Sequence, residues 1–214
     1  MKRFWLAAAL LFLGACAVTV GESSLIHPVK AGALDPAALT GNAARYTAEQ
    51  HWIARPDGAR LHAVLLRQPG AKATILYFGG NGFAIGKHGA WTASVFAPLG
   101  VDLMIVDHRG YGLSSGTPSI STGEADGLAA FDYLASLPPR PIVVHGHSLG
   151  SFVAGHVAAN RDAAAAVLES SATTTEGSPR APVPSPASFC GCGSTTRSRV
   201  AGTPRMSHAS WSRC

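Results

Sequence analysis

The chain has 214 residues, of which 47% are hydrophobic, enough apolar sequence for one domain with a buried core and too much for a disordered protein. Its formal net charge is +5, but the surplus lies at the two ends, with Lys2 and Arg3 at the start and five arginines after residue 177. Between these ends ten Lys and Arg residues stand against all twelve Asp and Glu residues, so the charge gives no reason to expect a nucleic-acid partner.

The first fifteen residues have the features of an export signal. A positive start precedes an apolar stretch over residues 4–13, which is shorter than a transmembrane helix requires. The stretch ends in Leu13-Gly14-Ala15-Cys16, which resembles the lipobox of bacterial lipoproteins, where the peptidase cuts before a lipidated cysteine. We therefore expect Cys16 to be the lipid attachment site; an ordinary secretory signal with an incidental cysteine is the alternative. The resemblance, together with Ala17 after the cysteine, implies a lipid-anchored protein of the bacterial cell envelope, facing the periplasm, with the outer membrane favoured.

Residues 16–45 are expected to carry the lipidated cysteine and a flexible tether, because they are small, contain Gly, Pro and Ala, and show no hydrophobic period. The folded domain is expected from residue 46 onward. Its first feature is a hairpin, in which residues 51–55 and 61–66 flank Pro56-Asp57-Gly58, a sequence that favours a tight turn.

Four later segments have the length and composition of β-strands: residues 74–78, 101–106, 141–144 and 163–168. The first three are continuous apolar runs, typical of strands buried on both faces of a parallel sheet. The fourth is rich in alanine and also suits a helix.

Helical segments separate these strands. One passes through Trp91, Val95 and Phe96, a second begins at Thr122 as its cap with two acidic residues in the first turn, and a third spans residues 152–160. Because strands alternate with helices, we predict an α/β domain with a mostly parallel, doubly wound sheet.

The third strand leads into Gly146-His147-Ser148-Leu149-Gly150, a G-x-S-x-G pattern between a strand and a helix. At such a junction a sharp turn exposes the serine, and the two glycines let the strand and the helix pack closely. We therefore expect Ser148 to be a catalytic nucleophile. The helix dipole and the backbone N–H of Leu149 could stabilise an oxyanion beside it.

A second oxyanion donor should come from the loop after the first buried strand. Gly79-Gly80-Asn81-Gly82 occupies that place, and its glycines allow the backbone to approach a substrate. We expect the donor to be the N–H of Asn81, with Gly82 as a near alternative. A simple glycine-rich turn without a role in chemistry is the other interpretation.

Together with this loop and the serine motif, the run Asp107-His108-Arg109-Gly110-Tyr111-Gly112-Leu113-Ser114 resembles the α/β-hydrolase superfamily. The resemblance covers roughly residues 50–177 of a domain expected at 46–177, and residues 116–119 are similar to the branch related to monoacylglycerol lipases and serine-aminopeptidase-like esterases. Gly79 stands where that branch commonly has histidine. The resemblance makes Asp107 and Arg109 structural rather than catalytic.

The resemblance implies hydrolysis of a carboxylic ester, thioester or amide through an acyl-Ser148 intermediate, with no cofactor. The expected partners are a small-molecule ester or amide or a lipid substrate, and the membrane through the N-terminal anchor. A non-catalytic module that binds lipid or acyl ligands, or an inactive hydrolase fragment, is the alternative.

No catalytic acid or base is identifiable in the sequence. In this fold the acid and then the histidine follow the serine, each after a later strand, yet the only histidines after Ser148 are His156 and His208. The neighbouring His145 and His147 should point away from the serine on a strand-to-helix turn. We therefore expect the activity of this chain to be impaired and its sheet to be incomplete at the C-terminal end.

Residues 178–214 differ in composition from the rest of the chain. They contain no Asp or Glu, but five Pro and eight Ser, and no apolar run or period. We expect this tail to be disordered and interpret it as out-of-frame translation. Its three cysteines, at 190, 192 and 214, have no histidine at ligand spacing, so no metal site is expected.

Overall fold

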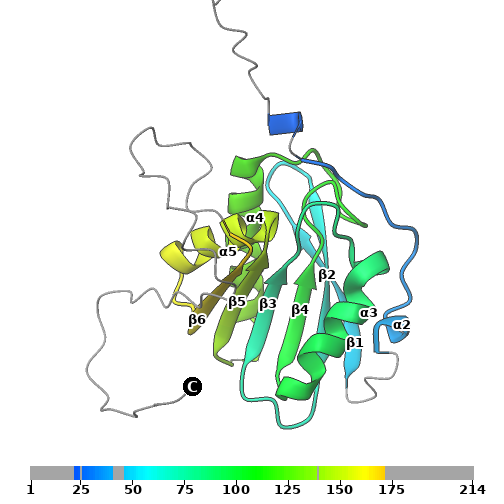
Figure 1. The fold of residues 1–214 in the computed structure, drawn as a ribbon, viewed down its shortest axis with the longest axis vertical. Coiled ribbons are helices and arrows are strands. Elements are labelled where there is room, and N and C mark those ends of the chain that lie inside the picture. The colour runs from blue at the N-terminus through cyan, green and yellow to red at the C-terminus, as the bar shows by residue number, and fades with distance from the viewer. Residues whose placement is uncertain (1–21, 25, 41–45, 139, 172–214) are drawn as a thin grey trace, which may run out of the picture.

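A computed structural model describes residues 22–24, 26–40, 46–138 and 140–171 (Figure 1). The expected signal peptide, Cys16 and the tail over 178–214 lie outside the described residues. Helices and short 3-10 turns are η1 (Glu22–Ser24), α2 (Ala37–Thr40), α3 (Ile85–Phe96), η2 (Ala97–Leu99), α4 (Ile120–Ala135) and α5 (Leu149–Asn160). The strands are β1 (Thr47–Ala54), β2 (Arg60–Arg67), β3 (Thr74–Phe78), β4 (Asp102–Val106), β5 (Ile142–His147) and β6 (Ala165–Glu169).

Six strands form one sheet in the order β1-β2-β4-β3-β5-β6. The hairpin of β1 and β2 is antiparallel, with Thr47 opposite Arg67, and β2 is also antiparallel to β4. The other four strands run parallel to one another. The predicted α/β class with a mostly parallel sheet is therefore confirmed, and the alanine-rich fourth segment is a strand.

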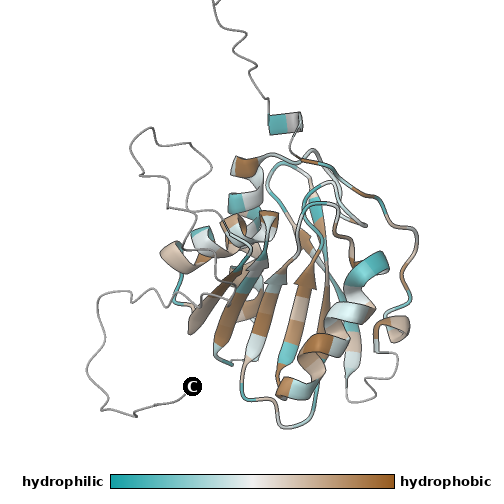
Figure 2. Ribbon diagram, viewed as in Figure 1, coloured by the Kyte–Doolittle hydropathy of each residue, from teal (hydrophilic) through white to brown (hydrophobic). Residues whose placement is uncertain are grey.

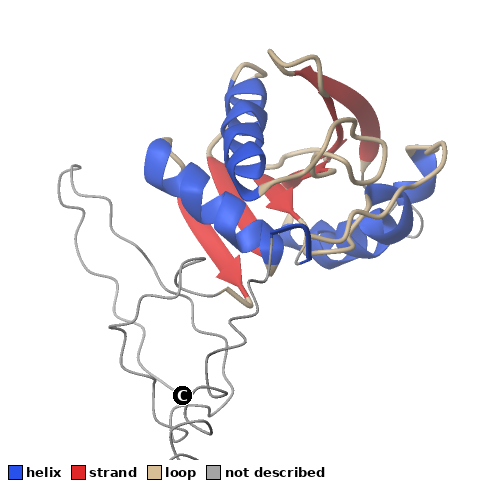
Figure 3. Cartoon of the chain, turned by 90° about the horizontal axis from the view of Figure 1, so that it is seen from above, coloured by secondary structure: helices blue, strands red, loops and turns tan. Residues whose placement is uncertain are grey.

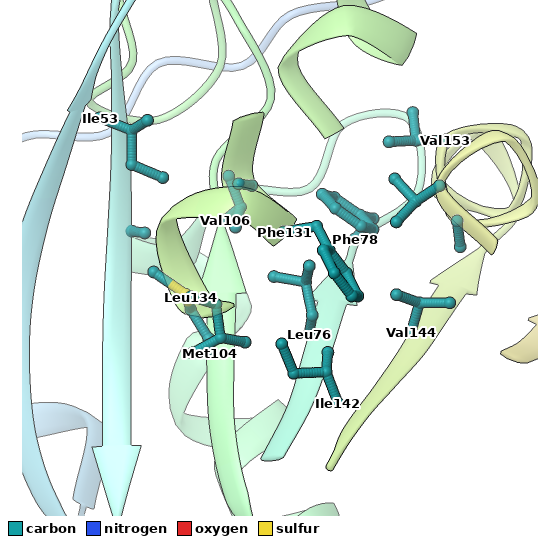
Figure 4. Close-up of a cluster of buried hydrophobic side chains, with 14 of the residues drawn as sticks. Ile53, Leu76, Phe78, Met104, Val106, Phe131, Leu134, Ile142, Val144 and Val153 are labelled. Carbon is teal, nitrogen blue, oxygen red and sulfur yellow. The ribbon is translucent and has the colours of Figure 1, made fainter. Parts of the chain in front are cut away.

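Helices cover both faces of this sheet (Figure 3). On one face α4 and α5 pack together over a buried cluster that includes Phe78, Met104 and Val153 (Figure 4). On the other face α3 contributes Ile85 and Phe96 to a second cluster. The central strands are accordingly hydrophobic along most of their length in Figure 2, because both of their faces are removed from water.

Two details of the helices differ from the sequence prediction. The cap of α4 is Ser119 rather than Thr122: the Ser119 hydroxyl accepts from the Thr122 N–H and the Thr122 hydroxyl accepts from the Ser119 N–H, which is a reciprocal capping box. The two acidic residues therefore lie beyond the first turn, and Asp126 is buried. The sequence placed α3 through Trp91, Val95 and Phe96. Of these three residues only Phe96 is buried, whereas Trp91 is 69% exposed.

Within the predicted tether, residues 26–40 pack against the domain. Lys30 forms a bridge with Gly112, and Leu39 of α2 is buried against α3 beside Gly89. Where we expected a segment without fold, residues 29–31 bond to the loop after β4, and Leu34 and Leu39 pack against the second core cluster. Within the described ranges, none of the helices has the length and apolar character needed to cross a membrane.

Candidate active site

The turn between β5 and α5 has the geometry of a nucleophile elbow. Ser148 has φ 50° and ψ −114°, a strained conformation for a residue with a side chain, and it is half-buried. Added Cβ atoms would lie 2.2 Å from the Gly150 oxygen at Gly146, and 2.1 Å from the Phe78 oxygen at Gly150. Only glycine therefore fits at both positions, because strand, loop and helix backbones are in direct contact there.

The loop after β3 lies directly against this elbow. A Cβ atom added at Gly80 would be 3.3 Å from the Ser148 Cβ, so the residue that precedes Asn81 lies beside the serine. Leu149 is the first residue of α5, and a helix provides no internal acceptor for the N–H at that position. At Gly82, the alternative donor, an added Cβ atom would lie 3.9 Å from Val29 Cγ2.

His108, in the loop after β4, bonds to the loop that follows β3, a contact that the sequence did not predict. Its Nε2 lies 2.7 Å from the Gly79 carbonyl oxygen, and burial lowers the pKa of His108, which keeps the ring neutral. Gly79 itself has no room for a side chain, because Phe83 occupies the space. A signal was present in the sequence: His108 is the second residue after β4, at the same carboxyl edge of the sheet as Ser148.

The Asn81 side chain is held by two other segments. Its Oδ1 accepts from the His27 N–H and from the Tyr111 hydroxyl, both at 2.8 Å, and its Nδ2 donates to His27 Nδ1 at 3.0 Å. Burial raises the pKa of Tyr111, so this hydroxyl stays protonated and able to donate. The loop beside the serine is therefore anchored at both Gly79 and Asn81.

Asp107 contacts only groups of the scaffold. Its carboxylate accepts from His62 Nδ1 at 2.8 Å, from the Ile85 N–H at 2.8 Å and from the Leu113 N–H at 3.2 Å. These partners join β2, α3 and the loop after β4. The contacts agree with the structural role expected for this residue.

Arg109 makes a paired contact with Asp126 of α4, in which Nε and one Nη each donate at 2.8 Å to a different carboxylate oxygen. It also bonds to Asp57 in the hairpin turn, and this bond lowers the pKa of the Asp57 carboxyl. The guanidinium thus ties the hairpin, the loop after β4 and α4 together, again as a structural group.

Within the described residues, the Ser148 hydroxyl makes no hydrogen bond and no histidine serves as its base. His145 Nε2 lies 3.3 Å from a Glu169 carboxylate oxygen, and burial between Tyr77 and Phe96 lowers its pKa. His147 packs against the loop at Gly80, and His156 lies 3.8 Å from Glu124. His208 lies outside the described residues.

A pocket adjoins the elbow, between the first turns of α5 and α4. Its apolar lining comprises Ile26, Tyr111, Ile120, Leu149, Phe152 and Val153. The cavity itself is small, about 30 Å³, and it opens to solvent. His108, Arg109 and Glu124 also line it, but most of the exposed lining surface is apolar, which suits an alkyl or acyl group. Among the described residues no cluster of His, Cys, Asp or Glu could hold a metal ion.

Parts of several known proteins are similar in sequence to this chain. A segment of the multifunctional-autoprocessing repeats-in-toxin of Vibrio cholerae is 28% identical over 142 residues, covering 65% of this chain and 3% of the toxin. Alpha/beta hydrolase domain-containing protein 17B of Xenopus tropicalis is 30% identical over 121 residues, covering 55% of this chain and 42% of that protein. Protein bem46 of Schizosaccharomyces pombe is 32% identical over 119 residues, covering 52% and 40%. The chain thus spans less than half the length of these proteins.

A solved structure shares the fold. The esterase Pf2001 of Pyrococcus furiosus aligns with a TM-score of 0.55 and 18% identity, over 67% of this chain and 55% of that one. The model of the Hydrolase_4 family, described as serine aminopeptidase, S33, matches residues 69–200. Because that match covers more than half of the chain, and the sheet is that of its α/β-hydrolase neighbours, the chain belongs to the serine aminopeptidase S33 family of α/β-hydrolases.

Proposed function

We propose that this protein is a serine hydrolase acting on carboxylic esters, thioesters or amides through an acyl-Ser148 intermediate. One observation carries the proposal: Ser148 sits at positive φ between β5 and α5, with the Gly80 loop against it. A strained residue at such a junction is retained where its side chain has a task, since a conformation of this kind costs about 1–3 kcal/mol.

In the proposed reaction the Ser148 Oγ attacks the carbonyl carbon of the substrate and a new C–O bond forms. The alcohol, thiol or amine then leaves with a proton, and water later cleaves the acyl-serine bond and returns a proton to Oγ. The developing oxyanion is stabilised by the N–H groups of Leu149 and Asn81. The positive end of the α5 dipole adds to this stabilisation.

The Oγ proton needs a base, and no histidine in the described residues is hydrogen-bonded to Ser148. We therefore propose that turnover by this chain is impaired. The same observation favours a second candidate function, a non-catalytic module that binds acyl ligands in the pocket lined by Ile26 and Leu149.

Covalent labelling with a fluorophosphonate separates these candidates. A hydrolase forms a Ser148 adduct with loss of fluoride, and the Ser148→Ala variant loses the adduct. Ser94→Ala, on the exposed side of α3, is the matched control and should label like the original protein. Labelling that survives Ser148→Ala would contradict the proposed nucleophile, and binding of acyl probes without any labelling would favour the binding module.

We also propose that Cys16 carries a lipid that anchors the protein in the cell envelope, facing the periplasm. The lipobox-like sequence before it supports this proposal. Metabolic incorporation of an alkyne fatty acid tests it, with Cys16→Ser as the control. Equal incorporation in both proteins, or none in either, would contradict it.

A further inference from the structure

The segment before the hairpin reaches the proposed catalytic loop, although it lies about fifty residues earlier in the chain. We call residues 26–31 the strap. Its backbone pairs with the loop after β4: Gly112 N–H donates to the Val29 oxygen at 2.7 Å, and Ala31 N–H donates to the Gly112 oxygen at 3.3 Å. The Lys30 ammonium donates to the Ser114 oxygen at 2.9 Å. The strap is thus bonded to the domain along its length.

His27 of the strap makes the contact closest to the chemistry. The Asn81 Oδ1 accepts from the His27 N–H, so the Asn81 Nδ2 must be the donor to His27 Nδ1. This pair of bonds, together with the Tyr111 hydroxyl on the same Oδ1, leaves the carboxamide one orientation. Because Asn81 follows Gly80, which lies beside Ser148, the strap is placed to influence where the Asn81 N–H points.

Ile26 forms part of the wall of the pocket beside the elbow. It is buried, with 9% of its surface exposed, and it lines the same space as Leu149 and Phe152. The other walls come from the domain itself. Removing atoms from Ile26 would therefore enlarge the pocket without changing the serine, the oxyanion loop or the core clusters.

We propose that the strap is part of the acyl site: Ile26 limits the length of acyl chain that the pocket accepts, and His27 positions the oxyanion loop through Asn81. This inference rests on the proposed function for its chemistry. It makes Ile26 a specificity-determining residue and His27 a positioning residue.

Inactivation by alkyl fluorophosphonates of different chain length tests both parts, because the reversible affinity and the rate constant of the covalent step can be measured separately. Ile26→Ala should raise the affinity for an octyl probe about tenfold relative to an ethyl probe, as expected from burying two further methylene groups. Ile26→Val should shift it in the same direction by a smaller factor. The covalent rate constant with the ethyl probe should not change.

His27→Ala should lower the covalent rate constant about tenfold for both probes and leave their affinities unchanged, because a misplaced oxyanion donor affects the transition state. His27→Asn should restore the rate, since its Oδ1 can accept from Asn81 as Nδ1 does. Gly32→Ala is the matched control, because a Cβ atom there meets nothing within 4 Å.

Equilibrium binding of dansyl fatty acids of graded length distinguishes failure of this inference from failure of the proposed function. If the protein does not label but Ile26→Ala shifts the preferred chain length, the hydrolase assignment fails and the role of Ile26 stands. If it labels with an unchanged length preference, the role of Ile26 is wrong. Absence of both labelling and binding would overturn the acyl site as a whole, and His27→Asn without rescue would overturn the positioning role.

Discussion

Substituting Gly150 by alanine should destabilise the protein, whereas the same substitution at Gly155 in the same helix should stabilise it. A Cβ atom at Gly150 would lie 2.1 Å from the Phe78 oxygen and 2.6 Å from the Gly79 oxygen, both backbone atoms that cannot rotate away. At Gly155 the nearest atom is the Leu168 Cδ1 at 3.7 Å, an ordinary contact. Both glycines lie in α5 and both substitutions add one methyl group, so the variants differ only in the space available to that methyl group.

Overpacking costs about 1–3 kcal/mol and sometimes more, so Gly150→Ala should lose about 2 kcal/mol net of the helix-propensity gain. Gly155→Ala should gain about 0.5–1 kcal/mol from propensity and from a less flexible unfolded chain. For a domain of this size each kcal/mol corresponds to about 2–4 °C in Tm.

Urea unfolding followed by far-UV circular dichroism measures both variants against the original chain. Gly150→Ala should also slow fluorophosphonate labelling, because relief of the clash moves the Phe78–Gly79 peptide and the loop that follows it. Equal stability of Gly150→Ala and the original protein, or equal losses at both glycines, would refute the view that close backbone packing shapes the elbow.

Three further predictions follow from single residues. Ser148→Gly should raise stability by about 1 kcal/mol by relieving the positive φ, while Ser148→Ala should give no such gain, as denaturant midpoints would show. Arg109→Ala should cost about 1–3 kcal/mol, since the buried Asp126 carboxylate loses its paired contact and keeps only its bond to Arg55, whereas Arg161→Ala at an exposed ion pair should cost less than about 1 kcal/mol; similar losses would contradict the structural role of Arg109. Burial lowers the pKa of His108 below 6.5, so the stabilisation from the neutral folded ring is complete above about pH 6.5 and is lost as the pH falls toward the folded pKa. His108→Gln should therefore reduce the dependence of the unfolding free energy on pH in that range. An unchanged slope would argue against a buried neutral ring.

Three histidines near Ser148 differ in how well their contacts could be predicted from the sequence. His145 contacts Glu169 and the His147 ring lies near Gly80, and that neither is the base of Ser148 stays a prediction. The role of His108 in holding Gly79 was missed, because the two residues are 29 positions apart and meet only when β3 and β4 pair. No local pattern records a contact of that kind.

The N-terminal segment shows the same limit. Its lack of hydrophobic period suggested a tether, yet the strap is bonded to Gly112 and Asn81. A few backbone hydrogen bonds and one buried isoleucine suffice to hold such a segment once a folded surface exists. Without that surface, its own sequence has too little apolar content to indicate structure.

By itself the sequence determined the strands, the order of strand and helix, and the place of Ser148 between them, because period and glycine spacing act within a few residues. Only the tertiary structure decided that β2 lies antiparallel beside β4, that His108 and His27 meet the loop after β3, and that Ile26 closes a pocket. The physical reason is that parallel strands bring their carboxyl ends to one edge of the sheet. There, loops from distant parts of the chain acquire neighbours that no local preference specifies.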